Sequence, residues 1–336
     1  MNLQHRIDLM IKLGGYLQGE EPEWLAIRDK ARIENGWFSR EFIDLSLKNI
    51  AGKFLERNKL ENWINKYSIP EINEHPLRIG IVMAGNLPLV GFHDFLCGFI
   101  SGHKLCMKLS SKDQVLLPHL VARLCEWEPQ LKDELTFSEM LKDCDAYIAT
   151  GSNNSGRYFE YYFAKYPHII RLNRTSVAIL DGTETDAQLS LLADDIQLYF
   201  GLGCRNVSKL YVPENYDFLP LLSALKRYDY LLDYHKYKHN YDYQLALLMM
   251  SLKKYMTSGA VLLSENTGVF SAVSHVYYEI YQDKNLLIRE LQDNPEIQCI
   301  VAKEFVPFGL TQQPELADYA DGRDTLQFLL DLGKKG

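Results

Sequence analysis

The chain has 336 residues, enough for about two domains of roughly 150 residues each. Its 47% hydrophobic and 24% charged residues are ordinary for a soluble globular enzyme, and the net charge of −8 argues against a broad nucleic-acid surface. Six cysteines without CxxC or Cys/His spacing argue against zinc and a disulfide framework, and suit a reducing cytosol.

Neither a targeting segment nor a metal site is expected. The N-terminal segment lacks the apolar core of a signal peptide, and no run approaches the roughly 18 apolar residues of a membrane-spanning helix. The pair His235 and His239 has helical i, i+4 spacing but no HExxH glutamate, so we expect no metal ligands. The sequence therefore predicts a cytoplasmic protein.

The first half of the chain predicts helices followed by a parallel sheet. Residues 1–67 have helical apolar spacing. From residue 77, short unalternating apolar runs are followed by helical patterns. Three such alternations indicate an open parallel sheet. The expected strands are 77–85, 103–111 and the start of 145–167, and the expected helices are 86–102, with Pro88 in its first turn and Gly102 after its end, 114–128 and the end of 145–167.

After residue 175 the alternation continues less regularly. Strands are expected at 176–182 and 208–213, with a helix at 185–201 between them. Residues 226–243 contain six tyrosines among basic residues. An amphipathic surface helix and loop is the simpler interpretation, and a ligand platform is the alternative.

A single cysteine stands out by its setting. In "GLGCRNVSKLYVP", Cys204 follows a Gly-Leu-Gly turn between a helical pattern and a strand pattern. A nucleophile needs such an accessible turn, whereas a structural cysteine does not. Arg205 stands beside it, where its positive charge would lower the pKa of the thiol.

Other candidate residues follow the expected strands. The "ATGSNNSGR" turn, with Gly151, Ser152 and Gly156, suits a phosphate at a helix N-terminus, although a plain strand–helix connection is the alternative. Asn86 follows a strand end, where its amide could donate to an oxyanion or simply cap a helix. Lys108 ends the next strand, either as a ligand contact or as a surface lysine.

Taken in order, these segments resemble the aldehyde dehydrogenase superfamily. The resemblance rests on "GNLPLVG", "SGHKLCMKLSS", "TGSNNSGR" and "LGCRNVSKLYV", over about residues 78–213. More narrowly, "IVMAGNLPLVGFHDFLCGFISGHKLCMKLSS" and "ADYADGRDTLQFLLDL" are similar to LuxC-type acyl-CoA reductases over nearly the whole chain. The resemblance implies an α/β fold of the aldehyde dehydrogenase type. A Rossmann-type parallel-sheet cofactor domain with N-terminal helices would span 1–174, and a second α/β domain with the catalytic cysteine and a C-terminal tail would span 175–336.

The resemblance also implies a reaction. The LuxC likeness implies a fatty acyl-CoA as substrate. The Cys204 thiolate would attack it, coenzyme A would leave, and reduction by NADPH would give the aldehyde. Asn86 and the backbone N–H of Cys204 would hold the oxyanion. The residues that would bind the cofactor are Lys108, Ser110, Ser111, Lys112, Gly151, Ser152 and Gly156.

Two departures from the superfamily pattern refine this expectation. The register places Arg171 where hydrolytic members carry a glutamate, so no carboxylate is expected to activate water. Where a glutamate commonly binds the adenosine ribose, this chain has Ser111, followed by Lys112. A neutral hydroxyl and an added cation favour the 2′-phosphate of NADPH over NADH.

Alternatives remain open at this stage. The chain could be an NAD(P)-dependent aldehyde dehydrogenase or an acyl-phosphate reductase, or a non-catalytic scaffold subunit. A homo-oligomer or an acyl-transferring partner subunit is also compatible with the sequence.

Overall fold

The computed structural model describes residues 1–333 and divides into two compact units. The first unit comprises Met1–Leu172 together with the chain from Pro314, and the second comprises Asn173–Gln313. The boundary near residue 173 lies close to the expected division at 174/175. The closing segment, which we expected in the second domain, instead packs with the first unit, and its last residues, 334–336, lie outside the described part.

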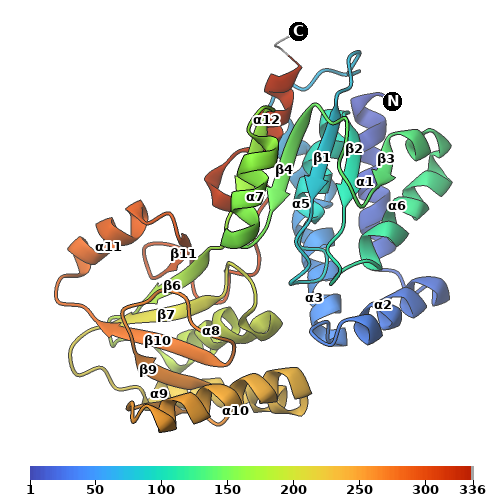
Figure 1. Ribbon diagram of the computed structural model, residues 1–336. Helices are drawn as coiled ribbons and strands as arrows, with labels where there is room; N and C mark the ends of the chain where they lie inside the picture. The colour runs from blue at the N-terminus through green and yellow to red at the C-terminus, as the bar shows by residue number, and fades with distance from the viewer. Residues whose placement is uncertain (334–336) are drawn as a thin grey trace. The chain divides into compact units, whose positions relative to one another are not determined.

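The first unit contains a parallel five-stranded sheet in the order β3-β2-β1-β4-β5 (Figure 1). Connections from β1 to β2 and from β4 to β5 run in opposite directions, so right-handed crossovers place α5 and α7 on opposite faces. This is the doubly wound arrangement expected from the sequence. The strands are β1 Arg78–Val82, β2 Lys104–Lys108, β3 Leu135–Phe137, β4 Ala146–Thr150 and β5 His168–Arg171.

Helices cover this sheet and bury the large core of the unit. α1 packs against α5 and α6, and α7 packs against β4 and β5. The helices are α1 Leu3–Leu17, α2 Pro22–Glu34, α3 Arg40–Asn49, the π-helical turn η1 Ile50–Phe54, α4 Arg57–Ile64, α5 Phe92–Ser101, α6 Leu116–Trp127, the 3₁₀ turn η2 Pro129–Asp133, and α7 Asn153–Phe163. Within residues 1–333, no helix has both the length and the apolar character needed to cross a membrane.

The helix expected at 86–102 is shorter than predicted. α5 begins at Phe92, so Asn86 and Pro88 lie in a loop and Pro88 is not in the first helical turn. The predicted end is correct, because Gly102 caps the helix in the left-handed conformation with φ +74°.

The C-terminal segment is held to the first unit by a polar cluster and a helix. The Tyr67 hydroxyl donates to Asp324 at 2.7 Å and lies 2.7 Å from the Tyr319 hydroxyl, which also accepts from Trp63 at 3.0 Å. α12, Thr325–Leu332, then packs on α5, after the 3₁₀ turn η5 Ala320–Gly322. These contacts explain why the segment belongs with the first unit.

The second unit has its own six-stranded sheet, in the order β11-β6-β7-β10-β9-β8. It is parallel except for the antiparallel pair β8–β9. The strands are β6 Thr175–Ile179, β7 Val207–Val212, β8 Met256–Thr257, β9 Leu262–Glu265, β10 His275–Ile280 and β11 Ile297–Val301. The helices are α8 Asp186–Gln197, η3 Leu198–Gly201, α9 Leu219–Leu225, η4 Lys226–Asp233, α10 His235–Met250 and α11 Lys284–Asp293.

The tyrosine-rich segment forms η4 and most of α10, and part of it is core. Tyr237 is fully buried, and its hydroxyl donates to Gln197 and to the Ala260 carbonyl, each at 2.9 Å. Tyr228 is buried and donates to Asp194 at 2.6 Å, whereas Tyr243 is exposed. The segment is amphipathic, and several of its tyrosines form the buried face.

Candidate functional site

In the first unit, two candidate segments begin at the carboxyl ends of neighbouring strands. β1 and β4 pair directly, with Val82 beside Ala149. The loop with Asn86 follows β1, and the turn at Gly151 follows β4. This is the point where the strand order reverses, the usual position of a ligand crevice in an open α/β sheet.

The loop after β1 is fixed by two buried polar side chains. The Ser46 hydroxyl donates to the Pro88 carbonyl at 2.7 Å. The Asp113 carboxylate accepts from the backbone N–H of Leu89 at 3.0 Å, and Leu89 has a left-handed φ of 56°. That conformation is rare for a leucine and persists only where its surroundings impose it. The conformation of the Asn86 loop is therefore determined by residues distant in sequence.

The loop after β2 carries the other predicted cofactor residues of this edge. The Lys108 carbonyl accepts from Met83 at 2.9 Å, and the Lys112 carbonyl accepts from the Asn35 side chain at 2.9 Å. Ser111 and Lys112 are exposed. A Cβ on Gly85 would lie 2.6 Å from the Cβ of Ser110, so only glycine lets the two loops approach this closely.

The glycine turn leads directly into α7. Ser152 is the N-cap of this helix, and its hydroxyl accepts from Ser155 at 3.3 Å. Gly156 lies inside the helix, where its N–H donates to the Ser152 carbonyl at 2.8 Å. A Cβ there would come within 2.2 Å of Leu172 Cδ2. In this structure Gly156 therefore serves close helix–sheet packing, while Gly151 and Ser152 remain at the helix N-terminus.

Arg171 is a structural residue of the first unit. It ends β5, is 3% exposed, and forms a buried ion pair with Asp94 of α5. Its second terminal nitrogen donates to the Thr325 hydroxyl of α12 at 2.6 Å. Arg171 therefore occupies the position where hydrolytic members carry a glutamate, and its charge is neutralised within the core by Asp94.

In the second unit, Cys204 lies on an exposed turn whose backbone is held firmly. The Ser176 hydroxyl donates to the Cys204 carbonyl at 3.0 Å. The Asn206 amide donates to the carbonyls of Asp195 and Leu198, at 3.1 and 2.9 Å, and its oxygen accepts from Gly203 at 2.8 Å. The turn is therefore tied to the end of α8 and to β6 while its side chain reaches solvent.

The chain before the cysteine adopts a conformation that the sequence did not predict. The expected helix at 185–201 ends at Gln197, and Tyr199, Phe200 and Gly201 all have left-handed φ, at 56°, 59° and 72°. Two consecutive left-handed aromatic residues are costly, at about 1–3 kcal/mol each. Burial of both aromatic side chains helps to hold this conformation. Backbone strain of this kind clusters at functional sites.

The remaining cysteines differ from Cys204 in exposure. All of them are buried, namely Cys97, Cys106, Cys125, Cys144 and Cys299. Arg205, which we expected to act on the Cys204 thiol, places one guanidinium nitrogen 3.3 Å from the sulfur of Cys299.

Four positioning residues were missed by sequence reasoning: Asp113, Ser176, Asp195 and Asn206. Asp195 is buried at the end of α8 and accepts from the backbone of Gly309 at 2.7 Å and from the Thr311 hydroxyl at 2.7 Å. Burial raises the pKa of both Asp113 and Asp195 to about 6. Only Asn206, two residues after the cysteine, had a signal in the sequence, because a polar residue at a turn often bonds to its own backbone.

Comparisons with known proteins place this fold and chain in context. The family model described as "Acyl-CoA reductase (LuxC)" matches residues 34–219. The chain is similar in structure to a Mycobacterium tuberculosis aldehyde dehydrogenase complexed with NAD+ (TM-score 0.61, 12% identity, covering 88% of this chain and 72% of that one). It is also similar to a Streptococcus pyogenes succinic semialdehyde dehydrogenase in complex with NADP+ (TM-score 0.61, 13% identity, covering 88% of this chain and 75% of that one). A third similar structure is aldehyde dehydrogenase 21 from Physcomitrella patens (TM-score 0.63, 15% identity, covering 86% of this chain and 71% of that one). No curated protein matches significantly. The expected fold of the aldehyde dehydrogenase type is confirmed.

Proposed function

The chain belongs to the LuxC acyl-CoA reductase family, whose model matches more than half of it, and from this premise we propose that it reduces an acyl-CoA to an aldehyde through a thioester on Cys204. The family is one of oxidoreductases. The NADPH preference, the fatty acyl substrate and the residue roles below are parts of the proposal.

The observation that carries the proposal is the turn of Cys204. The only exposed one of the six cysteines lies on a strained, glycine-flanked turn whose backbone is fixed by Ser176 and Asn206. A fixed backbone and an accessible thiol are what a covalent nucleophile requires.

The proposed reaction has two steps. The Cys204 thiolate attacks the thioester carbon of the acyl-CoA, a new carbon–sulfur bond forms, and the bond to coenzyme A breaks, so that coenzyme A leaves as a thiol. In the second step the enzyme thioester would accept a hydride, which NADPH would supply when bound. The products of this second step are the aldehyde, NADP+ and, after protonation, the Cys204 thiol. We assign the amide of Asn86 and the backbone N–H of Cys204 to the oxyanion, on the resemblance of their segments.

The residues at the edge of the first sheet fit a dinucleotide. Gly151 and Ser152 stand at the N-terminus of α7, where a phosphate is favoured. The close approach of Gly85 to Ser110 leaves the two loops side by side at the strand ends, with Lys108 at the end of β2. Lys108, Ser110, Ser111 and Lys112 would then face the adenosine end of the cofactor.

Two alternatives are less well supported. An oxidative aldehyde dehydrogenase needs a base to activate water, and Arg171 occupies the position in question, paired with Asp94. A non-catalytic scaffold would not need the strained backbone at Tyr199 and Phe200. An acyl phosphate as donor shares the thioester chemistry and differs only in the leaving group.

Incubation of the purified chain with palmitoyl-CoA and NADPH tests the proposal. We expect hexadecanal, free coenzyme A and NADP+ in equal amounts. Cys204→Ala should abolish both turnover and labelling by radioactive acyl-CoA, while Cys125→Ala, at a buried cysteine of α6, should retain both. Acylation that persists in Cys204→Ala would refute the assignment of the nucleophile. Turnover with palmitoyl phosphate but not palmitoyl-CoA would identify the other acyl donor.

A further inference from the structure

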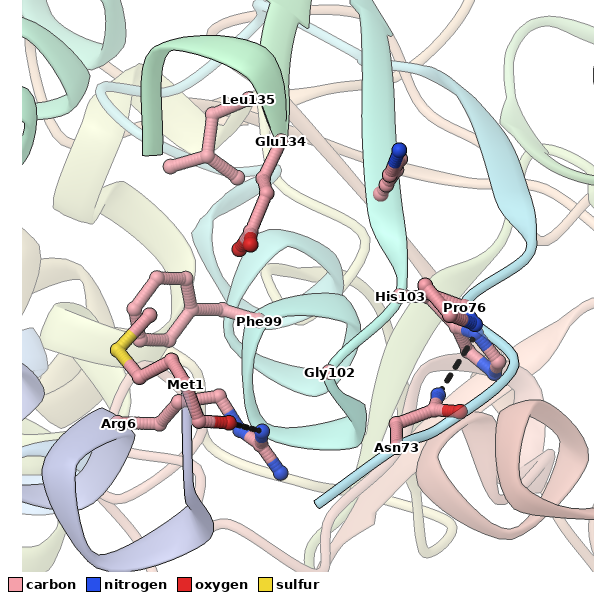
Figure 2. A pocket seen from close by; sticks show the side chains of 10 residues that line it. Met1, Arg6, Asn73, Pro76, Phe99, Gly102, His103, Glu134 and Leu135 are labelled. Carbon is pink, nitrogen blue, oxygen red and sulfur yellow. Dashed lines mark hydrogen bonds between the residues drawn. The ribbon is translucent and has the colours of Figure 1, made fainter. Parts of the chain in front are cut away.

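A small cavity lies at the edge of the first sheet opposite to the candidate cofactor residues. It is found where β2 and β3 begin, whereas Asn86 and Gly151 follow strand ends. Its volume is about 60 Å³. A water needs at least roughly 10–15 Å³ on this measure, so the cavity has room for several waters or one small molecule. Its lining includes Met1, Arg6, Asn73, Pro76, Phe99, Gly102, His103, Lys104, Glu134 and Leu135 (Figure 2).

Arg6 of α1 brings an incompletely bonded guanidinium to this cavity. The residue is 3% exposed. Its Nε donates to the Ile100 carbonyl at 3.1 Å. Its Nη1 donates to the Met1 carbonyl at 2.9 Å, as Figure 2 shows. Within residues 1–333, its buried Nη2 has no hydrogen-bond partner. A buried charged donor without a partner is costly, so a ligand or water is expected beside it.

The structure around Arg6 accounts for its other contacts but not for Nη2. Its bond to Ile100 places a cation at the C-terminal end of α5, where a positive charge is favourable. Gly102 makes this position available, because a Cβ there would lie 2.8 Å from Nη1. This helix-end contact uses Nε and explains the burial of the side chain, whereas it gives Nη2 no hydrogen-bond partner among the described residues.

The charges around the cavity favour an anion with a single charge. Lys104 adds a second cation to Arg6, and Glu134, whose carboxylate points toward the space in Figure 2, contributes one negative charge. His103 is neutral, because its Nδ1 accepts from the Leu77 N–H at 3.1 Å and burial lowers its pKa. Two cations and one carboxylate leave one positive charge, and Glu134 would repel a dianion.

We propose that this cavity binds one small monocarboxylate, with its carboxylate on Arg6 Nη2 and near Lys104, and a short alkyl chain against Phe99 and Leu135. Guanidinium groups pair well with planar carboxylates, and the apolar side chains of Phe99 and Leu135 suit a short hydrocarbon. The proposal does not depend on the proposed function, since every residue involved belongs to the first unit and none is assigned to the reaction.

Saturation-transfer NMR with acetate and butyrate, at constant ionic strength, tests the site. We expect saturable binding of both, with butyrate at least as tight as acetate. Lys104→Gln should weaken binding by about two- to fivefold, and Glu134→Gln should strengthen it by a similar factor, as for partly exposed charge pairs. Arg6→Gln should abolish binding, and its melting temperature would show whether the fold is retained.

Controls separate this site from others. Lys66→Gln, at an exposed lysine outside the cavity, and Cys204→Ala should both bind like the unmodified chain. Equal affinities in Lys104→Gln, Glu134→Gln and the unmodified chain would overturn the proposal even if Arg6→Gln unfolds. So would the absence of saturable binding, which would mean that water alone fills the cavity, or tighter binding of inorganic phosphate than of acetate.

Discussion

The buried carboxylate of Asp113 accepts a hydrogen bond from the backbone N–H of Leu89, at 3.0 Å. The two residues lie on different loops at the same edge of the first sheet. Leu89 closes the loop that carries Asn86, and Asp113 follows the loop that carries Ser111 and Lys112. One carboxylate therefore couples the loop proposed to stabilise the oxyanion with the loop proposed to bind the cofactor.

This coupling has a dependence on pH that can be measured. Burial raises the pKa of Asp113 to about 6, so the folded state binds the proton more tightly than the unfolded state. The stability from this group is full below about pH 4 and is lost as the pH rises through about 6. Asp113→Asn should therefore raise the free energy of unfolding at pH 7.5 by about 3 kcal/mol and change it little at pH 4. Urea unfolding at both pH values measures this, with the exposed Asp133→Asn as control. If Asp113→Asn changed the free energy of unfolding equally at pH 7.5 and pH 4, the prediction would be wrong.

Asn206 should control the reactivity of Cys204 without touching the substrate. Asn206→Ala leaves the partly buried Gly203 N–H and Leu198 carbonyl without this partner, at a cost of about 1 kcal/mol for each. A loosened turn would misplace the thiol, so we expect single-turnover acylation to slow at least about tenfold in protein that remains folded. The control is Asn240→Ala, which removes an exposed hydrogen bond from a side-chain amide within α10. Normal acylation in Asn206→Ala would show that the turn is held by other contacts.

The sequence predicted those parts of the fold that local pattern determines. β1, β2 and β4 are buried apolar runs, and Gly102 ends α5 as glycine commonly does. The accessible turn of Cys204 was likewise visible from its flanking glycines. These features depend on residues a few positions apart.

Contacts between distant residues decided what the sequence could not predict. The start of α5 moved to Phe92 because Leu89 is held in a left-handed conformation by Asp113. β3 has three residues and lies at a sheet edge, so its apolar pattern is too short to recognise. The C-terminal segment belongs to the first unit through the hydrogen bond from Tyr67 to Asp324. The sequence around neither residue indicates this contact.

The buried pair of Arg171 and Asp94 should be important for stability rather than catalysis. Arg171→Met leaves the Asp94 carboxylate buried without its cation, which costs about 3–5 kcal/mol. The double variant Arg171→Met with Asp94→Leu removes both charges and should recover most of that loss. Thermal and urea unfolding of the single and double variants measure the coupling. An equal loss in the free energy of unfolding in the single and the double variant would mean that the lost hydrogen bond to Thr325, and not the unpaired Asp94 charge, destabilises the fold.

The same pair predicts a long-lived acyl-enzyme. With Arg171 in place of a carboxylate and Asp94 paired to it, no base is expected to activate water at that position. With palmitoyl-CoA and no reduced cofactor, acyl-Cys204 should accumulate to one equivalent while fatty acid release stays slow. Mass spectrometry of the intact chain measures the acyl-enzyme, and extraction of labelled palmitate measures the release of fatty acid. Steady thioesterase turnover would reveal another base.

The cofactor preference should depend on the loop after β2. Ser111 and Lys112 are both exposed there, and the loop is held by the bond from Asn35 to the Lys112 carbonyl. Without a carboxylate at Ser111, a 2′-phosphate meets no repulsion, and Lys112 can offer a charge-assisted hydrogen bond of about 1.5–3 kcal/mol. The middle of that range is roughly a fortyfold preference. We therefore expect kcat/KM to be higher with NADPH than with NADH by about that factor. Ser111→Glu should reverse or erase the difference and Lys112→Gln should reduce it, while Lys66→Gln should leave it unchanged. Equal kcat/KM with both cofactors in the unmodified enzyme would refute this role of the loop without affecting the chemistry of Cys204.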